Sequence, residues 1–188
     1  MGRAQSFDRF AADYDRFARL EQPHVLNWLL TQLPAHAGRA LDAGCGSGRH
    51  TARLTERFDD VVGVDISAPL IDIARQRSGP NVRYVVSDLM AFTDPDGFDL
   101  VFSAGTLHHV PDLDTALLHL RSLVRPGGLA ILIDNVASRQ TPPRWVHVLG
   151  GVIFPEARFE RLGYAHGVVW EKKNPAAVAR GHEVRRKP

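Results

Sequence analysis

The sequence predicts an α/β domain in which helices cover both faces of a doubly wound, mostly parallel sheet of about five strands. Three observations carry this prediction. Short apolar segments alternate with helix-compatible segments between residues 39 and 133, as in parallel sheets that are buried on both faces. A turn with three glycines follows the first apolar segment, and acidic residues follow the next two. The length of 188 residues suits a single domain, residues 1–188.

The N-terminal region, residues 1–36, predicts helices. Phe7, Phe10, Tyr14 and Phe17 recur at spacings of three, four and three residues, which places them on one face of a helix. This aromatic stripe has two interpretations. It packs in the core, or it forms a lid over a ligand pocket.

The central region, residues 37–136, predicts the sheet. The expected elements, in chain order, are strand 39–43, helix 49–58, strand 61–65, helix 69–76 with Ser67 as its N-cap, strand 82–86, strand 98–103, helix 113–124 and strand 129–133. Residues 137–188 are expected to be helical or irregular, because the alternating pattern weakens beyond Asp134.

Charge and cysteine content narrow the function classes. The chain has 23 lysines and arginines and 21 aspartates and glutamates, and this surplus is too small to indicate a nucleic-acid partner. Cys45 is the single cysteine, so an intrachain disulfide is excluded. No apolar run approaches the roughly 18 residues of a membrane span, and the N-terminus lacks a signal-peptide pattern. We therefore expect a cytoplasmic protein that binds neither membrane nor nucleic acid.

The glycine turn indicates a ligand that approaches the backbone closely. Gly44, Gly46 and Gly48 alternate after Asp42, and glycine permits both positive φ and close contact. A dinucleotide-binding G-x-G-x-x-G motif would place its third glycine at position 49, which is Arg49 here. The pattern therefore speaks against a nicotinamide dehydrogenase.

Polar residues follow four of the expected strands, where parallel sheets bind ligands. Asp65 ends the second strand, 23 positions after Asp42, and a carboxylate there can accept hydrogen bonds from both hydroxyls of a ribose. Asp88 and Leu89 follow the third strand, where a carboxylate and a backbone amide suit adenine. The fourth strand ends at residues 103–109, SAGTLHH.

Six motifs occur together in one order: Leu41 to Gly48, Val64 to Ser67, Ser87 to Leu89, Asp99 to Ser103, Leu107 to Val110 and Leu123 to Gly128. With these motifs, residues 6–136 closely resemble the class I S-adenosylmethionine-dependent methyltransferases, which have a Rossmann-like fold. The resemblance extends to the small-molecule branch that includes ubiquinone-biosynthesis-like enzymes. It implies S-adenosyl-L-methionine as cofactor, S-adenosyl-L-homocysteine as product, and methylation of a small molecule on oxygen, nitrogen or carbon.

The resemblance also implies a cofactor site. Its residues would be Tyr14, Asp42, Gly44, Cys45, Gly46, Gly48, Arg49, Asp65, Ile66, Asp88, Leu89 and Ser103. The glycines would pass close to the methionine part, Asp42 would orient its amino group, and Ser103 would offer a carbonyl to the ammonium. Asp65 would hold the ribose, Ile66 and Leu89 would flank the adenine, and Asp88 would bind its amino group. Tyr14 would belong to the lid, and Arg49 would reach the carboxylate or remain a surface residue.

Two histidines are candidates for the catalytic base. A base is needed only if the acceptor still carries a proton, and His108 or His109 would serve because histidine titrates near neutral pH. The alternative is that one packs under the loop while the other is solvated. A metal site formed with Asp112 and Asp114 is a weaker interpretation, because the spacing matches no standard metal motif. No metal is therefore expected.

The C-terminal region departs from the family, which normally ends its sheet with an antiparallel hairpin of strands six and seven. Two interpretations arise. The favoured one lacks the hairpin and leaves strand 129–133 as an apolar edge, to be covered by a helix or by a homo-oligomer. In the other, Val168 to Glu171 forms a stunted extra strand. The missing hairpin also raises a second function, a protein that binds S-adenosylmethionine or S-adenosylhomocysteine without methyltransferase activity and acts as a partner or regulator.

Overall fold

The computed structural model describes Asp8, Ala11, Asp13 and residues 23–33, 37–135, 156–162 and 165–174. Its elements are α3 Pro23–Gln32, β1 Ala37–Ala43, α4 Thr51–Leu54, β2 Phe58–Asp65, α5 Ala68–Arg75, β3 Val82–Val86, β4 Phe98–Ala104, the 3-10 helix η1 Leu107–His109, α6 Leu113–Leu123, β5 Val124–Asn135, β6 Arg158–Leu162 and β7 Ala165–Glu171. Within these ranges, no helix has the length and apolar character needed to cross a membrane.

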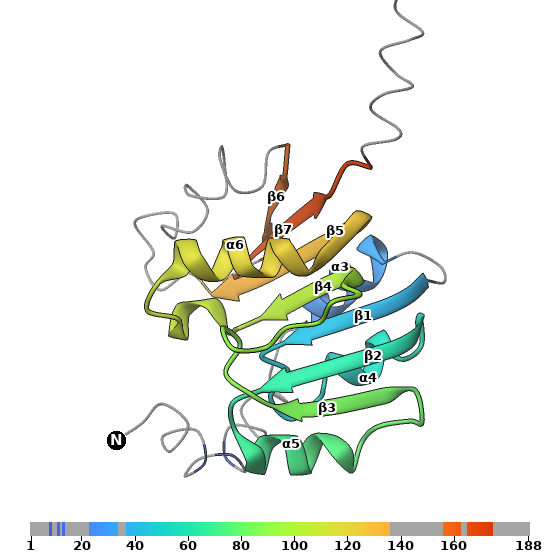
Figure 1. Cartoon of the computed structure of the whole chain (residues 1–188), viewed down its shortest axis with the longest axis vertical. Helices are drawn as coiled ribbons and strands as arrows, with labels where there is room; N and C mark the ends of the chain where they lie inside the picture. Colours follow the sequence, from blue (N-terminus) through green and yellow to red (C-terminus); the bar gives the residue numbers. More distant parts are fainter. Residues whose placement is uncertain are drawn as a thin grey trace, which may run out of the picture.

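One sheet of seven strands organises the described chain, in the order β3-β2-β1-β4-β5-β7-β6. The pairs among β1 to β5 are parallel, and β7 pairs antiparallel with both β5 and β6. The strand order reverses between β1 and β4, so this is the switch point at which doubly wound sheets bind ligands. The expected α/β doubly wound fold is confirmed (Figure 1).

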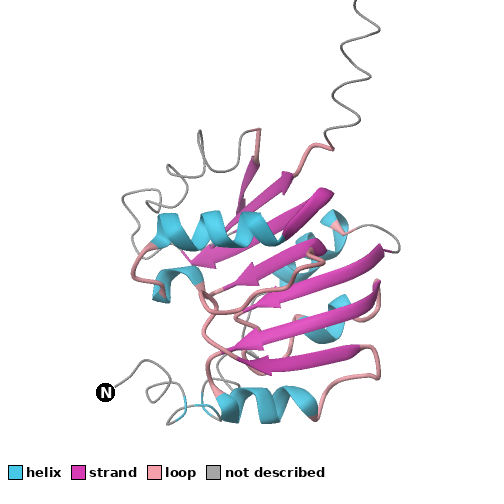
Figure 2. Ribbon diagram, viewed as in Figure 1, coloured by secondary structure: helices cyan, strands magenta, loops and turns pink. Residues whose placement is uncertain are grey.

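Two hydrophobic cores lie on opposite faces of the sheet, because successive residues of a strand point to opposite faces. In β1, Leu41 packs with the core that includes α6, whereas Ala40 packs with the core that includes α3 and α4. Figure 2 shows the corresponding layers, with α6 in front of the strands and α3 and α4 behind them. Helices therefore cover both faces, as the apolar strands predict.

The expectation that the hairpin is missing is wrong. β7 pairs with β5 from Leu129↔Glu171 to Asn135↔Ala165, and β6 adds a further strand outside it. Val168 and Trp170 are buried, and Gly167 lies against the ring of Trp28, which leaves no room for a side chain. The apolar edge of β5 is thus paired within the chain, and the reason for expecting a homo-oligomer through that edge disappears.

Two further predictions need correction. The helix expected over residues 49–58 is only four residues long, because Phe58 is buried and begins β2, pairing with the start of β1. Residues 156–174, expected to be helical or irregular, contain the two hairpin strands. The predicted N-cap is present, since the Ser67 hydroxyl accepts a hydrogen bond from the amide of Leu70.

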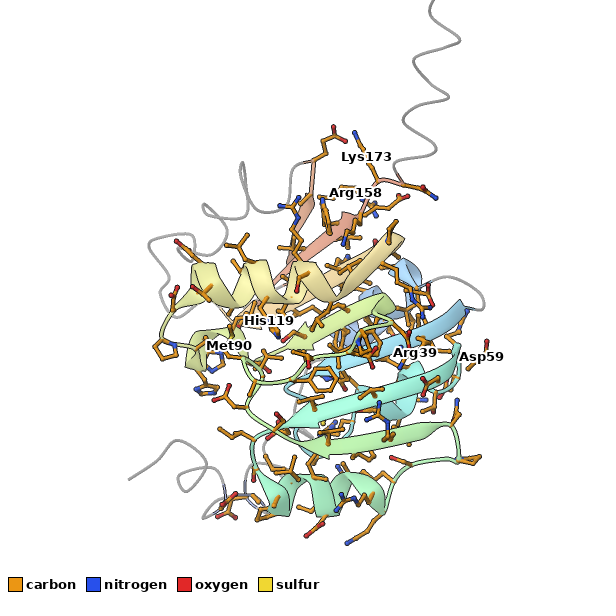
Figure 3. The ribbon with its side chains drawn as sticks, in the orientation of Figure 1. Arg39, Asp59, Met90, His119, Arg158 and Lys173 are labelled. Carbon is orange, nitrogen blue, oxygen red and sulfur yellow. The ribbon has the colours of Figure 1, made fainter. Side chains whose placement is uncertain are left out.

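A cluster of ion pairs connects the strands near their amino ends. The guanidinium of Arg39 donates two hydrogen bonds to Asp94, at 3.0 and 3.1 Å, and one of 2.8 Å to Asp60. Asp99 accepts a hydrogen bond of 2.7 Å from the Arg39 amide and one of 3.0 Å from Arg125. Figure 3 shows Arg39 and Asp59 at this end of the strands and Met90 at the other end. These pairs join β1, β2, β4 and β5 at the edge opposite the strand ends that bind ligands in such sheets.

Candidate functional site

The glycine turn after β1 is fixed by its neighbours. Gly44, Gly46 and Gly48 all have positive φ, at 77°, 52° and 76°. The amides of Gly44 and Cys45 both donate to the carbonyl of Val64, at 2.8 and 3.0 Å, so the turn is tied to the end of β2. A Cβ at Gly48 would lie 2.8 Å from the Cβ of Ala74, so close packing requires this glycine. The sequence therefore fixes both the shape and the position of the turn.

A pocket opens at the carboxyl ends of β1 to β4, where Figure 1 shows the arrowheads of these strands at one edge of the sheet. Its empty volume is about 690 Å³, including the part that is open to solvent. The lining consists of Gly44, Gly46, Val64, Asp65, Ile66, Leu70, Ser87, Asp88, Leu89, Gly105, Thr106, His109 and Val110. Six of the twelve expected cofactor residues line it: Gly44, Gly46, Asp65, Ile66, Asp88 and Leu89.

Asp65 presents an oriented carboxylate to this pocket. One carboxylate oxygen accepts the amide of Gly46 at 2.8 Å, and the other accepts the amide of Ser67 at 2.9 Å. Burial raises the pKa of Asp65, backbone hydrogen bonds oppose this shift, and the charge of Asp8 adds to it. A carboxylate has about four acceptor sites, so Asp65 can still accept hydrogen bonds from a ligand.

Ile66, Asp88 and Leu89 form an apolar part of the pocket lining with a carboxylate beside it. Asp88 is exposed, and one of its carboxylate oxygens accepts the amide of Met90 at 2.8 Å. Ile66 and Leu89 line the same pocket from the ends of β2 and β3. An apolar, planar group between these side chains would bring its polar edge toward the Asp88 carboxylate.

The two histidines occupy different positions. His109 lines the pocket, whereas His108 does not. The Nδ1 atom of His108 lies 2.6 Å from a carboxylate oxygen of buried Asp134, and this hydrogen bond raises the pKa of His108, against the effect of burial. Burial and the neighbouring charge of His108 lower the pKa of His109. Sequence analysis proposed both histidines without separating them, and the structure distinguishes them.

Three of the expected cofactor residues lie beneath the pocket wall. Asp42 is buried and accepts a 2.6 Å hydrogen bond from the Thr51 hydroxyl, and the Ser103 hydroxyl donates to the carbonyl of Ala43 at 2.8 Å. Cys45 is also buried, and burial together with the charges of Asp42 and Asp65 raises the pKa of its thiol, so the thiol is neutral. The hydrogen bonds of Asp42 and Ser103 therefore hold the residues on either side of the glycine turn.

The remaining expected residues are Gly48, Arg49 and Tyr14. Gly48 and Arg49 are not on the pocket lining. The Nη1 atom of Arg49 is buried and has no hydrogen-bond partner among the described residues. Tyr14 lies outside the described residues.

Sequence reasoning missed several lining residues and the partner of His108. The missed lining residues are Val64, Leu70, Ser87, Gly105, Thr106 and Val110. Most of them are next to a recognised motif residue, so position after a strand could have found them. Asp134 near the end of β5 is an acid after an apolar run, which is the same signal that identified Asp65. Among the described residues, no three His, Cys, Asp or Glu side chains form a group that could hold a metal ion.

Comparisons with known proteins find methyltransferases. A family model described as "Methyltransferase domain" matches residues 40–128. The chain is 38% identical over 128 residues to a malonyl-[acyl-carrier protein] O-methyltransferase of Salmonella typhimurium, covering 67% of this chain and 50% of that protein. It is 35% identical over 158 residues to a trans-aconitate 2-methyltransferase of Azoarcus, covering 78% and 59%. The chain therefore spans between half and three fifths of the length of these curated relatives.

Solved structures show the same fold. The N-methyltransferase NodS from Bradyrhizobium japonicum, in complex with S-adenosyl-l-homocysteine, superposes with a TM-score of 0.72 at 20% identity, covering 92% of this chain and 98% of that one. A DhpI–SAH complex superposes with a TM-score of 0.64 at 24% identity, covering 96% and 84%. At these identities the likeness establishes the fold alone.

Proposed function

We propose that this chain is a class I S-adenosylmethionine-dependent methyltransferase that transfers a methyl group to a small molecule, and the match of residues 40–128 to a methyltransferase-domain model supports this. One observation carries the proposal. The glycine turn, Asp65 and Asp88, which lie far apart in the sequence, meet in one pocket at the switch point of the sheet. Such a pocket suits an aminoacyl nucleoside better than a dinucleotide, because position 49 is arginine.

The residues present fit this cofactor. Gly105 has a φ of 66°, and a Cβ built on it would meet no atom within 4 Å, so the backbone beside the pocket has open space. The Nη1 atom of Arg49 is buried without a hydrogen-bond partner in the described part of the chain, and it would suit the methionine carboxylate. Asp65 would hold the ribose hydroxyls, and Asp88 would bind the adenine amino group between Ile66 and Leu89. Gly44, Gly46 and Gly48 would set the turn above buried Asp42, Cys45 and Ser103, and Tyr14 would serve in a lid.

The bound cofactor supplies an activated methyl group on a sulfonium, so the protein contributes alignment and a dry site. Holding two reactants in line is worth roughly 7–11 kcal/mol of the barrier. Ile66, Leu70, Leu89 and Val110 line the pocket with apolar surface, which reduces the access of water. His109 lines the same pocket and is the nearer candidate for a base, whereas His108 would act through it.

The acceptor is proposed as a small molecule methylated on oxygen, nitrogen or carbon. The two named relatives support this class, because they methylate malonyl-[acyl-carrier protein] and trans-aconitate. Placement in the ubiquinone-biosynthesis-like branch rests on the sequence motifs and stays a proposal. The alternative of a cofactor-binding protein without transferase activity depended on a missing hairpin, and the hairpin is present, so no observation now favours it.

Calorimetry tests the proposal first. Titration with S-adenosylmethionine and S-adenosylhomocysteine should show binding of both, and titration with NADH should show none. If neither methionine-derived ligand binds at millimolar concentration, the proposed function is wrong. A turnover assay that measures S-adenosylhomocysteine release over a panel of hydroxyl, amine and carboxylate acceptors then separates a methyltransferase from a binding protein.

A further inference from the structure

Asp134 is a buried acid that does not line the pocket and has no role in the proposed cofactor site. Its residue is 1% exposed, near the end of β5. One carboxylate oxygen accepts the backbone amide of His108 at 3.0 Å, and the other pairs with the Nδ1 atom of the same residue at 2.6 Å. Since Asp134 already accepts the backbone amide, we assign the hydrogen of the second contact to Nδ1, which fixes the tautomer of His108.

A ring contact continues from this pair to the pocket. The imidazoles of His108 and His109 lie with their centroids 3.8 Å apart and their planes inclined by 46°. His109 lines the pocket together with Thr106 and Gly105. Asp134, His108 and His109 thus form a continuous series of contacts from the interior of the sheet to the pocket wall.

We propose that Asp134 is a positioning residue for methyl transfer: it fixes His108, and His108 in turn holds the imidazole of His109 at the pocket wall as the acceptor of the substrate's proton. This inference rests on the proposed function. It also narrows the substrate class to molecules whose nucleophile still carries a proton when it binds, with a hydroxyl as the simplest case. For an acceptor that binds as a carboxylate, as malonyl and aconitate groups do near neutral pH, His109 would have no proton to accept, so the inference separates the acceptor of this chain from those of the two named relatives.

The surroundings of the two rings shift the pKa values of His108 and His109 in opposite directions. The hydrogen bond and the charge of Asp134 raise the pKa of His108. Burial and the charge of His108 lower the pKa of His109, and the charge of Asp134 opposes this shift. Other charged groups nearby are Asp112 and Asp114 at the start of α6, and Asp65 and Asp88 in the shared pocket. None of these four is among the causes of either shift. The two shifts therefore favour the proton on His108 over the proton on His109.

The step balances without a further reactant. As the bond between the acceptor oxygen and the methyl carbon forms, the carbon–sulfur bond breaks and its electron pair stays on sulfur. The hydroxyl proton passes to a ring nitrogen of His109 and leaves later to water. Nothing is oxidised or reduced.

Histidine NMR tests the arrangement without any acceptor. Protein labelled with ¹⁵N-histidine is titrated between pH 5 and 9 as wild type, Asp134→Asn, His108→Gln and the control Asp114→Asn. Asparagine keeps the size of Asp134 and an oxygen for the His108 amide but removes the charge, so the pKa of His108 should fall. His108→Gln removes a neighbouring positive charge, so the pKa of His109 should rise. The exposed control should change neither value.

Two results would overturn the proposal. One is a His108 pKa that is unchanged in Asp134→Asn, which would leave Asp134 a purely structural role in holding the loop. The other is a His109 pKa that is unchanged in His108→Gln, which stays informative even if Asp134→Asn fails to fold. S-adenosylhomocysteine affinity, measured in parallel, should stay within about twofold of wild type in both variants, because neither residue lines the pocket. Loss of binding in wild type would instead refute the proposed function and leave the NMR result standing.

Discussion

The two edges of the sheet use the same residue type, aspartate, in opposite ways. At the amino edge, Asp94 and Asp60 are bound by the guanidinium of Arg39, and Asp99 is bound by Arg125. At the carboxyl edge, Asp65 and Asp88 accept hydrogen bonds only from backbone amides within the described part of the chain. One edge has its acids neutralised by arginine, and the other presents them to a pocket.

The difference separates stability from function. A carboxylate bound by arginine is already satisfied in the free protein, and it stabilises the fold without attracting a ligand. A carboxylate held by amides keeps its charge and part of its acceptor capacity, so a ligand with hydroxyl or amino groups can bind it. Mutations at the amino edge should therefore change the free energy of unfolding, and mutations at the carboxyl edge should change affinity.

Arg39→Ala should give the largest effect. The substitution leaves Asp94, whose side chain is 9% exposed, without its bidentate partner, and losing one partner of a buried pair costs about 3–5 kcal/mol. Urea unfolding should show this loss. Arg53→Ala, which breaks an exposed pair with Glu56, is the matched control and should cost less than about 1 kcal/mol. Equal effects of the two substitutions would mean that the cluster does not stabilise the fold.

Asp65→Ala should weaken binding of S-adenosylhomocysteine by on the order of 2–4 kcal/mol, because two charge-assisted hydrogen bonds to the ribose would be lost. Calorimetry measures this change, and circular dichroism checks that the variant is folded. Asp60→Ala, an acid at the amino edge, serves as the control and should leave affinity unchanged. A folded Asp65→Ala variant with wild-type affinity would refute the assigned role and the contrast between the edges.

Asp88→Ala should produce a smaller loss of affinity. The residue is exposed, so one hydrogen bond to the adenine would contribute about 1 kcal/mol, or roughly fivefold in the dissociation constant. The unfolding free energy should hardly change. Comparing adenosine with inosine as competing ligands sharpens the test, since inosine lacks the amino group: the substitution should reduce the affinity for adenosine only. An equal loss of affinity for adenosine and inosine would show that Asp88 does not bind the amino group.

Most of the parallel sheet was predictable because its strands contain short runs of apolar residues, such as Val61 to Val64 in β2 and Leu129 to Ile133 in β5. Leu129 to Ile133 has no polar residue, and such a run between helix-compatible segments indicates a buried parallel strand. The hairpin was missed because β6, with the sequence RFERL, is mostly polar, and because its partner β7 contains Gly167 and His166. Pairing with β5 and contact with Trp28 stabilise the hairpin, and neither is visible in local sequence.

The candidate site was predictable where a side chain directly follows a strand. Asp65 and Asp88 satisfy that rule, and both line the pocket. The rule fails for Asp42, which is buried against Thr51 from the following helix. It was not applied to Asp134, whose partner His108 lies 26 residues earlier in the chain. Which histidine lines the pocket depends on the direction of one short 3-10 helix, and spacing alone does not specify it.

The pH dependence of stability should give the smallest effect. It tests the His108–Asp134 pair, in which an acid near the carboxyl ends of the strands is bound by a basic side chain, as the acids of the amino edge are. Because Asp134 raises the pKa of His108 in the folded state, the pair stabilises the protein fully below the ordinary histidine pKa and loses this contribution as pH rises through the raised value. His109 acts in the opposite sense, but its lowered pKa confines its effect to pH values below the ordinary one.

Above the ordinary histidine pKa of 6.5, the difference in unfolding free energy between wild type and His108→Gln should therefore shrink as pH rises. The change should be below about 1 kcal/mol, because the His108 side chain is 38% exposed and solvent screens the pair. Urea unfolding at several pH values measures it, and the same comparison in an Asp134→Asn background should show no such trend. If the trend persists without the Asp134 charge, this pair does not cause it. The carboxyl edge would then lack the stabilisation by charge pairs that the amino edge has.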